Sequence, residues 1–179
     1  VFAFNSADGE DAAGGVMSAN GVDGETSDIT IIHSTFFDNQ ADVGNTIGGF
    51  TDSVASELNI ELDNNIFAGL DVEGDHYAVE DASVTAPIPV SLGGNLVTDT
   101  SLDPFLIPED ESGDDKDPDF ESPDDVDFHI GVDSDAENLG LAEFSPATDI
   151  DGNDRIVGDN PDAGAYENQN PNFIKDEIL

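Results

Sequence analysis

Oxygen-bearing side chains gather around one glycine near the C-terminal end of the chain, where they could bind a metal ion. Asp149, Asp151, Asn153 and Asp154 alternate around Gly152. Carboxylate and amide oxygens at such a spacing are the ligands that Ca²⁺ takes in protein loops. The segment lacks the complete D-x-D-x-D-G-x₅-E pattern, and no glutamate stands where the bidentate ligand would be. It therefore predicts a calcium site of incomplete pattern, with a polar turn as the alternative.

Three histidines could also ligate a metal ion or transfer a proton. They are His33, His76 and His129, which lie far apart in the sequence, and the chain has no cysteine to complete a zinc site. His33 and His129 alternate with apolar neighbours in strand-like runs, which predicts that both face outward. We expect surface or corner histidines rather than a three-histidine zinc site.

A catalytic pair of carboxylates cannot be singled out, because the chain has 42 acidic residues. Enzymes that cleave acidic polysaccharides place basic side chains near the substrate, and here only Lys116, Arg155 and Lys175 are basic. No nucleophile elbow, P-loop or dinucleotide-binding fingerprint occurs. The sequence therefore predicts that the protein is not an enzyme, with a polysaccharide lyase or glycosidase as the alternative.

The acidic excess excludes several classes of partner. With 42 acidic and 3 basic residues, the formal net charge is −39. Such a chain cannot neutralise a nucleic-acid backbone, and anionic lipid surfaces would repel it. No apolar run reaches the roughly 18 residues of a transmembrane helix. We therefore expect no nucleic-acid partner and no direct insertion into a membrane.

Two explanations of the acidity remain open. The carboxylates fit adaptation to high salt, because a Debye length of about 3 Å near 1 M salt screens their mutual repulsion. They equally fit binding of Ca²⁺, the only cofactor that the sequence suggests. Under either explanation, we expect the fold to weaken in low salt without divalent ions. Thermal unfolding in dilute buffer, compared with NaCl and CaCl₂, checks this expectation.

Short strands must position these side chains. The chain is 37% hydrophobic with eleven phenylalanines, so it can bury a core despite its charge. Strand-like runs occupy residues 28–32, 58–62 and 87–92, and sliding the chain by thirty residues aligns them. The aligned sets are Thr30, Ile60 and Val90; Ile32, Leu62 and Leu92; Thr35, Asn65 and Asn95; Phe36, Ile66 and Leu96; and Phe37, Phe67 and Val97.

This period predicts an all-β fold in which equivalent strands stack. A two-strand unit cannot bury its apolar side alone, whereas units stacked about 4.8 Å apart pair each strand with its equivalent. Asn65 and Asn95 would then hydrogen-bond one above the other. An antiparallel sandwich with apolar pairs at a chance spacing is the alternative.

Motifs in the second half resemble the closing segment of a known family. The chain contains D-P-D-F at 117–120, D-F-H-I at 127–130, S-P-A-T-D at 145–149 and D-A-G-A-Y-E at 162–167. A D-G-N-D-R element at 151–155 completes the set. In this order they resemble bacterial and archaeal right-handed parallel β-helix proteins of the choice-of-anchor type. Those surface or secreted proteins are related to polymorphic outer-membrane-protein repeats.

Earlier segments are also similar to coils of that family, so that the resemblance covers about residues 28–167. They are T-F-F-D-N-Q-A at 35–41, N-I-F-A-G at 65–69 and G-N-L-V at 94–97. Two departures stand out: Thr148 replaces the usual isoleucine, and an acidic insert follows the third coil. Family members usually have many more coils upstream.

The resemblance implies a right-handed parallel β-helix of a few coils with a C-terminal cap. We expect a joint or partial coil at 1–27, coils at 28–107, an acidic loop at 108–125 that is disordered, and a cap and tail at 126–179. In the cap, Arg155 is the lone arginine and should be bound bidentately by Glu167 or Asp149. Tyr166 and Phe144 should pack the cap against the last coil.

The function expected from this fold is structural. The resemblance implies a non-catalytic structural or adhesive module of a prokaryotic extracellular or cell-surface protein. Its partners would be further coils or a second copy, joined as a filament or layer by strand addition. The alternative is a β-helix that binds or degrades extracellular polysaccharide. The chain starts at Val1, and we expect a processed chain or an excised fragment.

Overall fold

The computed structural model describes residues 1–7, 16–19, 26–49, 57–69, 75–79 and 88–170, and these form an all-β protein. The three helical turns among them are short 3₁₀ turns: η1 (Asp103–Phe105), η2 (Pro123–Asp125) and η3 (Ala142–Phe144). None of the described helices is long and apolar enough to cross a membrane. Parts of the expected N-terminal joint and of the tail lie outside the described residues.

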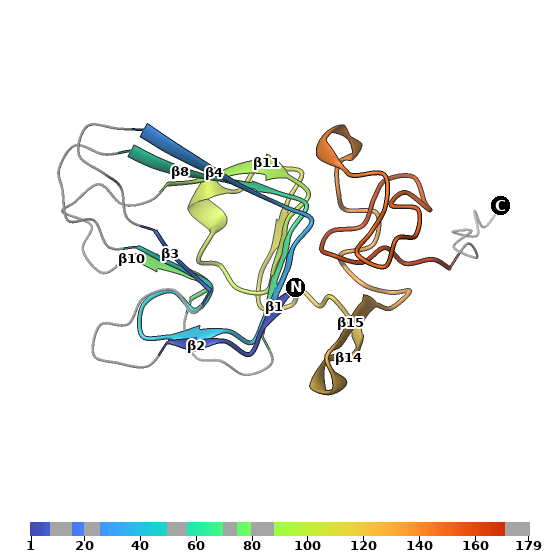
Figure 1. Cartoon of the computed structure of the whole chain (residues 1–179), viewed down its shortest axis with the longest axis horizontal. Helices are drawn as coiled ribbons and strands as arrows, with labels where there is room; N and C mark the ends of the chain where they lie inside the picture. Colours follow the sequence, from blue (N-terminus) through green and yellow to red (C-terminus); the bar gives the residue numbers. More distant parts are fainter. Residues whose placement is uncertain (8–15, 20–25, 50–56, 70–74, 80–87, 171–179) are drawn as a thin grey trace.

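Three parallel sheets form the first part of the molecule, which we call the parallel stack (described residues 1–112; Figure 1). One sheet contains β4 (Thr26–Ile32), β8 (Glu57–Asp63) and β11 (Ile88–Gly93). The second contains β3 (Met17–Ala19), β7 (Ile47–Gly49) and β10 (Tyr77–Val79). The third contains β1 (Phe2–Ala3), β5 (Thr35–Phe37), β9 (Ile66–Ala68), β12 (Leu96–Val97) and β13 (Glu111–Ser112). The pair β2 (Ser6–Ala7) and β6 (Gln40–Ala41) is also parallel.

The register of the stack departs from a strict thirty-residue period. Ile66 pairs with Leu96 and Phe67 with Val97, thirty residues apart as expected. Between the preceding strands, however, Phe36 pairs with Phe67 rather than with Ile66, a separation of 31 residues. At the start of β11, Ile88 pairs with Asn59, a separation of 29 residues. After an irregularity between Ser91 and Gly93, Gly93 pairs with Asp63, a separation of thirty residues. The apolar pattern could not detect this shift, because both faces of β5 and β9 are buried.

The interior of the stack is an apolar core shared by the three sheets. Phe36, Phe67 and Val97 point into it from the third sheet, and Ile60 and Leu62 from the first. The rings of Phe36 and Phe67 stack with their centroids 4.9 Å apart, close to the spacing of neighbouring strands. Leu102, which comes just before η1, is buried in the same core, and Phe105 of η1 packs against it, so residues that follow β12 also contribute to the core.

The C-terminal segment (residues 113–170) covers the outer face of the third sheet. Phe37, Ile66 and Leu96 on that face form a second apolar cluster with Phe128 and Ile130. The last two belong to β15 (Asp127–Ile130), which pairs antiparallel with β14 (Phe120–Ser122). The expected cap over the last coil is therefore wrong in its position, since the segment lies along the side of several strands (Figure 1). Burial of Phe37, Ile66 and Leu96 requires such a lateral cover.

The acidic residues 108–125 are not the disordered loop that we expected. They include β13, β14 and η2. Asp110 explains part of this order, because its carboxylate accepts hydrogen bonds from the backbone N–H groups of Asn95 and Ile107. A carboxylate that accepts backbone hydrogen bonds fixes the chain around it.

Candidate functional site

A ladder of side-chain oxygens holds one corner of the parallel stack. Asn65 Oδ1 accepts the backbone N–H of Ser34 at 3.0 Å, and Asn95 Oδ1 accepts that of Asn65 at 3.0 Å. Asp110 Oδ1 continues the series by accepting the N–H of Asn95 at 2.8 Å. The structure thus joins Asn65 to Asn95 directly, and the Asn65 amide also donates to Asn95 Oδ1 at 3.0 Å. These two residues position the corner and leave no polar group for a ligand.

Arg155 is buried in the C-terminal segment, but its guanidinium does not bind a carboxylate there. Its two terminal nitrogens donate to the carbonyl oxygens of Gly164 at 3.1 Å and Ala165 at 2.9 Å. The bidentate partner that we expected, Glu167 or Asp149, is therefore wrong for the direct contact. Burial lowers the pKa of the guanidinium, and the negative charges of Glu167 and Asp149 partly oppose this by raising it.

Glu167 instead binds backbone N–H groups, as do the neighbouring buried carboxylates. Its two oxygens accept the N–H of Val157 and of Asp162, both at 2.9 Å. Burial raises the pKa of Glu167 to about 7. Asp162 in turn accepts the N–H groups of Asn138 and Asn168 at 2.7 Å. These carboxylates hold together a segment that has few strands.

The four residues of the calcium candidate are not brought together as ligands. Asp149 is buried and its oxygens accept the backbone N–H groups of Asp151, Asn153 and Glu167. Asp151 binds His129 Nε2 at 2.8 Å, and Asn153 and Asp154 are exposed. Across the described part of the chain, no group of three or more acidic or histidine side chains is placed to hold a metal ion. Calcium binding stays a prediction.

Tyr166 lies against His129, with the ring centroids 4.2 Å apart, and packs on the second apolar cluster. Phe144, which we expected to pack beside it, is 48% exposed. His129 bridges Asp127 and Asp151; partial burial lowers its pKa, but the two hydrogen bonds outweigh this and raise it overall. His129 therefore serves as a local clamp between two carboxylates.

His33 does not face outward as the alternation predicted, and it is buried at the corner after β4 with φ 43°. Its Nε2 lies 2.7 Å from Ser145 Oγ in the C-terminal segment, and burial lowers its pKa to about 4. The corner turns the chain, so the alternation of β4 does not continue through it.

Asp63 is the most isolated buried carboxylate of the described residues. It is fully buried at the end of β8, and neither carboxylate oxygen has a hydrogen-bond partner. Burial raises its pKa to about 6, and the charges of Asp110 and Glu143 act in the same direction. A proton removes the negative charge, which no hydrogen bond in the surroundings stabilises.

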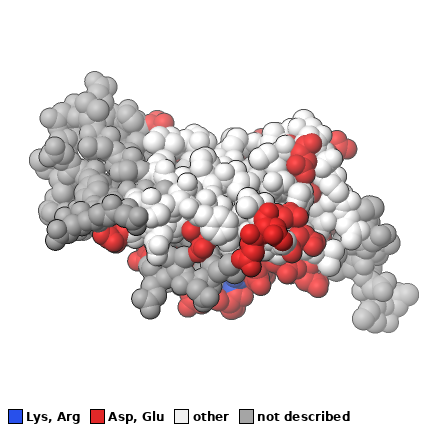
Figure 2. All heavy atoms as spheres, turned by 60° about the horizontal axis from the view of Figure 1, so that its bottom comes forward, with Lys and Arg blue, Asp and Glu red and all other residues white. Residues whose placement is uncertain are grey.

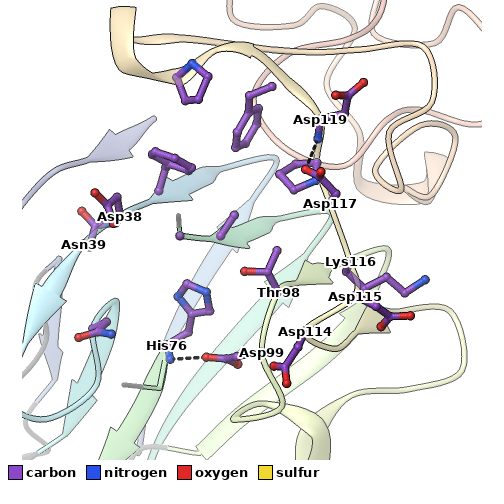
Figure 3. A pocket seen from close by; sticks show the side chains of 17 residues that line it. Asp38, Asn39, His76, Thr98, Asp99, Asp114, Asp115, Lys116, Asp117 and Asp119 are labelled. Carbon is purple, nitrogen blue, oxygen red and sulfur yellow. Dashed lines mark hydrogen bonds between the residues drawn. The ribbon is translucent and has the colours of Figure 1, made fainter. Parts of the chain in front are cut away.

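An acidic cleft lies between the parallel stack and residues 114–123 (Figure 3). Its volume is about 590 Å³, within the range of small-molecule sites. Phe37 and Phe120 contribute apolar surface, and most of the other lining residues are polar. The acidic residues of the lining are Asp38, Asp99, Asp114, Asp115, Asp117 and Asp119, and the basic residue is Lys116.

His76 projects into this cleft from the residue before β10 (Figure 3). Its ring is nine-tenths buried, with Nδ1 3.2 Å from Thr46 Oγ1. The backbone N–H of His76 donates to Asp99 Oδ2 at 2.8 Å, which fixes the residue against the wall. Burial lowers the pKa of the imidazole, so the ring is neutral near pH 7.

Sequence reasoning missed the cleft because its lining residues come from positions 37–123 with no common spacing. The thirty-residue step between Thr46 and His76, which are in contact, was the one available signal. Acidic residues also occur throughout the chain, so the acidic residues of the lining could not be distinguished from the others.

Comparisons with known proteins add no identity. No family model matches the chain. No curated protein and no solved structure matches it either.

Proposed function

We propose that the protein is a structural or adhesive module built as a right-handed parallel β-helix, part of a prokaryotic extracellular or cell-surface protein. Its role is non-catalytic, and it joins further coils or a second copy by strand addition. Three parallel sheets support the β-helix, because their paired strands from β3 to β12 are separated by 29–31 residues. Crossovers between parallel strands are right-handed in nearly all proteins, which supports the handedness.

The observation that carries the assembly proposal is the unfinished ladder at β1. Phe2 stacks on Phe36 with centroids 5.2 Å apart, and Phe36 stacks on Phe67. Strand β1 is at the edge of its described sheet, and Phe2 is 46% exposed. A further strand added to β1 would bury the free face of Phe2 and pair the open backbone edge.

The test is self-association measured by light scattering or sedimentation at several protein and salt concentrations. We expect the mass to rise with protein concentration, and Phe2→Lys to reduce this rise because a charge blocks the edge. Phe144→Lys is the matched control, since Phe144 is also about half exposed but lies in the C-terminal segment. Monomers under all conditions, or equal effects of both substitutions, would count against the proposal.

A second candidate function is binding of an extracellular polysaccharide without cleavage. The acidic cleft favours it, because a polar hollow of about 590 Å³ is larger than an ion needs and can hold several hydroxyl groups. Polysaccharide binding and assembly involve different surfaces, β1 and the cleft, so both can belong to one adhesive module. Cleavage has no comparable support, and we propose none.

A further inference from the structure

We propose that the parallel stack binds a second copy of this chain end to end, as a closed two-fold dimer in which the two β1 strands pair antiparallel. The stack has two ends. The β1 end is formed by the edge strands β1, β3 and β4, and the β13 end by the edge strands β10, β11 and β13. The inference rests on the proposed strand addition at β1, and it specifies the partner and the symmetry.

The β13 end is blocked on all three sheets. On β10, the backbone N–H of Tyr77 donates to Ser101 Oγ at 3.1 Å, and a ring of η1 packs edge-on against Tyr77. Strand β11 contains Pro89, which has no N–H to offer a further strand, and η1 lies against this strand. Beside β13, the ammonium of Lys116 binds the carboxylate of Glu111. Proline, lysine and covering segments prevent strand addition at sheet edges, so this end is a poor acceptor for another copy.

Among the described residues, the β1 end shows none of these blocking features. Its edge strands contain no proline and no basic residue. Met17 of β3 and Ile29 and Ile31 of β4 pack on the interior core but are only partly buried. Phe2 of β1 is also exposed on one side. Apolar side chains therefore lie along unpaired strand edges, which is the combination that strand addition covers.

Charge favours a contact between two β1 ends. A second copy brings a formal charge of −39, so it binds best where acidic side chains are few. The strands β1, β3 and β4 contain one acidic residue, Asp28, whose carboxylate accepts a hydrogen bond from Asn59 at 2.9 Å. By contrast, residues 99–111 at the β13 end include five acidic residues. Figure 2 shows that acidic side chains gather densely on part of one face, with little basic surface among them.

A two-fold axis beside β1 pairs both open edges at once. Rotation about an axis perpendicular to β1 turns the second β1 into an antiparallel neighbour, so that the backbone groups of the two strands pair. The exposed side of each Phe2 is then covered by the other copy. Such a contact uses the same surface on both copies, so it closes at two chains. Head-to-tail stacking would instead need an open β13 end and would continue without limit.

Sedimentation equilibrium of the whole chain over a range of protein concentrations tests the stoichiometry. We expect the mass to rise with concentration and to level off at twice the mass of one chain. The dimer should be tighter in about 1 M NaCl than in dilute buffer, because a Debye length of roughly 3 Å screens the repulsion between the two acidic copies.

Single cysteines locate the interface, because the chain has no cysteine of its own. Val1→Cys, Ala3→Cys and Phe4→Cys are made one at a time and oxidised mildly. A residue near a two-fold axis faces itself at the Cβ separation of about 4 Å that a disulfide needs. At least one of these variants should therefore form several times more disulfide-linked dimer than Val132→Cys, an exposed control in the C-terminal segment. Ser112→Cys in β13 should form no more than the control, and thermal unfolding checks that each variant is folded.

The ways in which the inference can fail are distinguishable from failure of the proposed function. A mass that grows beyond two chains, or disulfides between Ala3→Cys and Ser112→Cys chains in a mixture, overturns the two-fold dimer but leaves strand addition at β1 standing. A dimer that is linked at the β1 end no better than at Val132 overturns the β1 end as the interface. Monomers at every protein and salt concentration overturn both the dimer and the proposed assembly.

Discussion

In the parallel stack, backbone groups of one strand bind those of the next, whereas in the C-terminal segment acidic and amide side chains bind the backbone. Strand pairing and an interior of Phe, Ile, Leu and Val hold most of the stack, and side chains bind the backbone mainly at one corner. The C-terminal segment has one short antiparallel pair, and Asp149, Asp162 and Glu167 bind its turns instead. The strands of the stack therefore depend little on which acidic side chains lie on their surface, whereas the segment of turns depends on carboxylates at specific positions.

The largest expected effect is Phe67→Ala in the core of the stack. Phe67 is fully buried and stacks on Phe36, so we expect a loss of about 4 kcal/mol of unfolding free energy. Chemical denaturation measures this loss. The exposed control Phe144→Ala should cost well under about 1 kcal/mol. A small effect at Phe67 would mean that the interior core does not hold the stack.

Next comes Arg155→Met in the C-terminal segment. The substitution leaves the carbonyl groups of Gly164 and Ala165 without donors and three acidic side chains without a nearby cation. We expect a loss of about 3 kcal/mol, because a buried charged network loses one partner. Hydrogen exchange should show the loss first in residues 130–167 and only later in β8 and β9. Uniform loss across both regions would contradict the division between them.

Asn95→Ala tests the side-chain ladder at the corner of the stack. The variant removes the acceptor of Asn65 and the donor to Leu62 O, and leaves both groups buried. The expected loss is about 2 kcal/mol. Asn59→Ala is the control, because Asn59 hydrogen-bonds at an exposed position on β8. Denaturation curves of the two variants measure the difference, and equal losses would show that the corner ladder adds nothing special.

Asp63→Asn should give the smallest effect, and it should stabilise. Because burial raises the pKa of Asp63 from 3.8 to about 6, the folded protein holds this proton more tightly than the unfolded chain. The stability it contributes is complete below about pH 4 and is lost as the pH rises through about 6. Asparagine removes that loss of roughly 3 kcal/mol, but its amide finds no hydrogen-bond partners in the same place, so the net gain should be about 1 kcal/mol at pH 7.

The pH dependence of unfolding between pH 4 and about 8 checks this prediction. Glu167 contributes with the same sign up to about pH 7, so Asp63→Asn should flatten only part of the slope. Asp124→Asn, at an exposed position, is the control and should leave the slope unchanged. An unchanged slope in Asp63→Asn would show that Asp63 is not the group that titrates.

The sequence predicted the strands of the stack better than the contacts of the C-terminal segment. Apolar alternation located β4, β8 and β11 within one or two residues, and the shared spacing indicated the contact between Asn65 and Asn95. The one-residue shift in pairing at Phe36 could not be predicted, because a strand buried on both faces has no polar side to fix its register.

Contacts in the C-terminal segment depend on turn geometry that residue types do not specify. We expected the guanidinium of Arg155 to bind a carboxylate, but in the turn at Gly164 and Ala165 two backbone carbonyl oxygens accept hydrogen bonds from its terminal nitrogens. Asp149 is part of the calcium candidate, and its oxygens accept local N–H groups that the spacing did not indicate, while calcium binding stays a prediction. The cleft could not be predicted either, since it exists only where 114–123 passes beside the stack.

The lateral position of the C-terminal segment limits how the protein can change in length. The segment contacts successive strands of the third sheet: Ala165 N–H binds Thr35 Oγ1, and Gly164 N–H binds Asn64 O at the turn into β9. Gly164 also passes so close to Ile66 that a Cβ there would lie 2.6 Å from Ile66 Cδ1. An extra repeat inserted between β5 and β9 would move these anchors apart by about 4.8 Å. The C-terminal segment therefore fits a stack with a fixed number of repeats between its anchors. A duplicated repeat could be added without moving these anchors on the far side of β1.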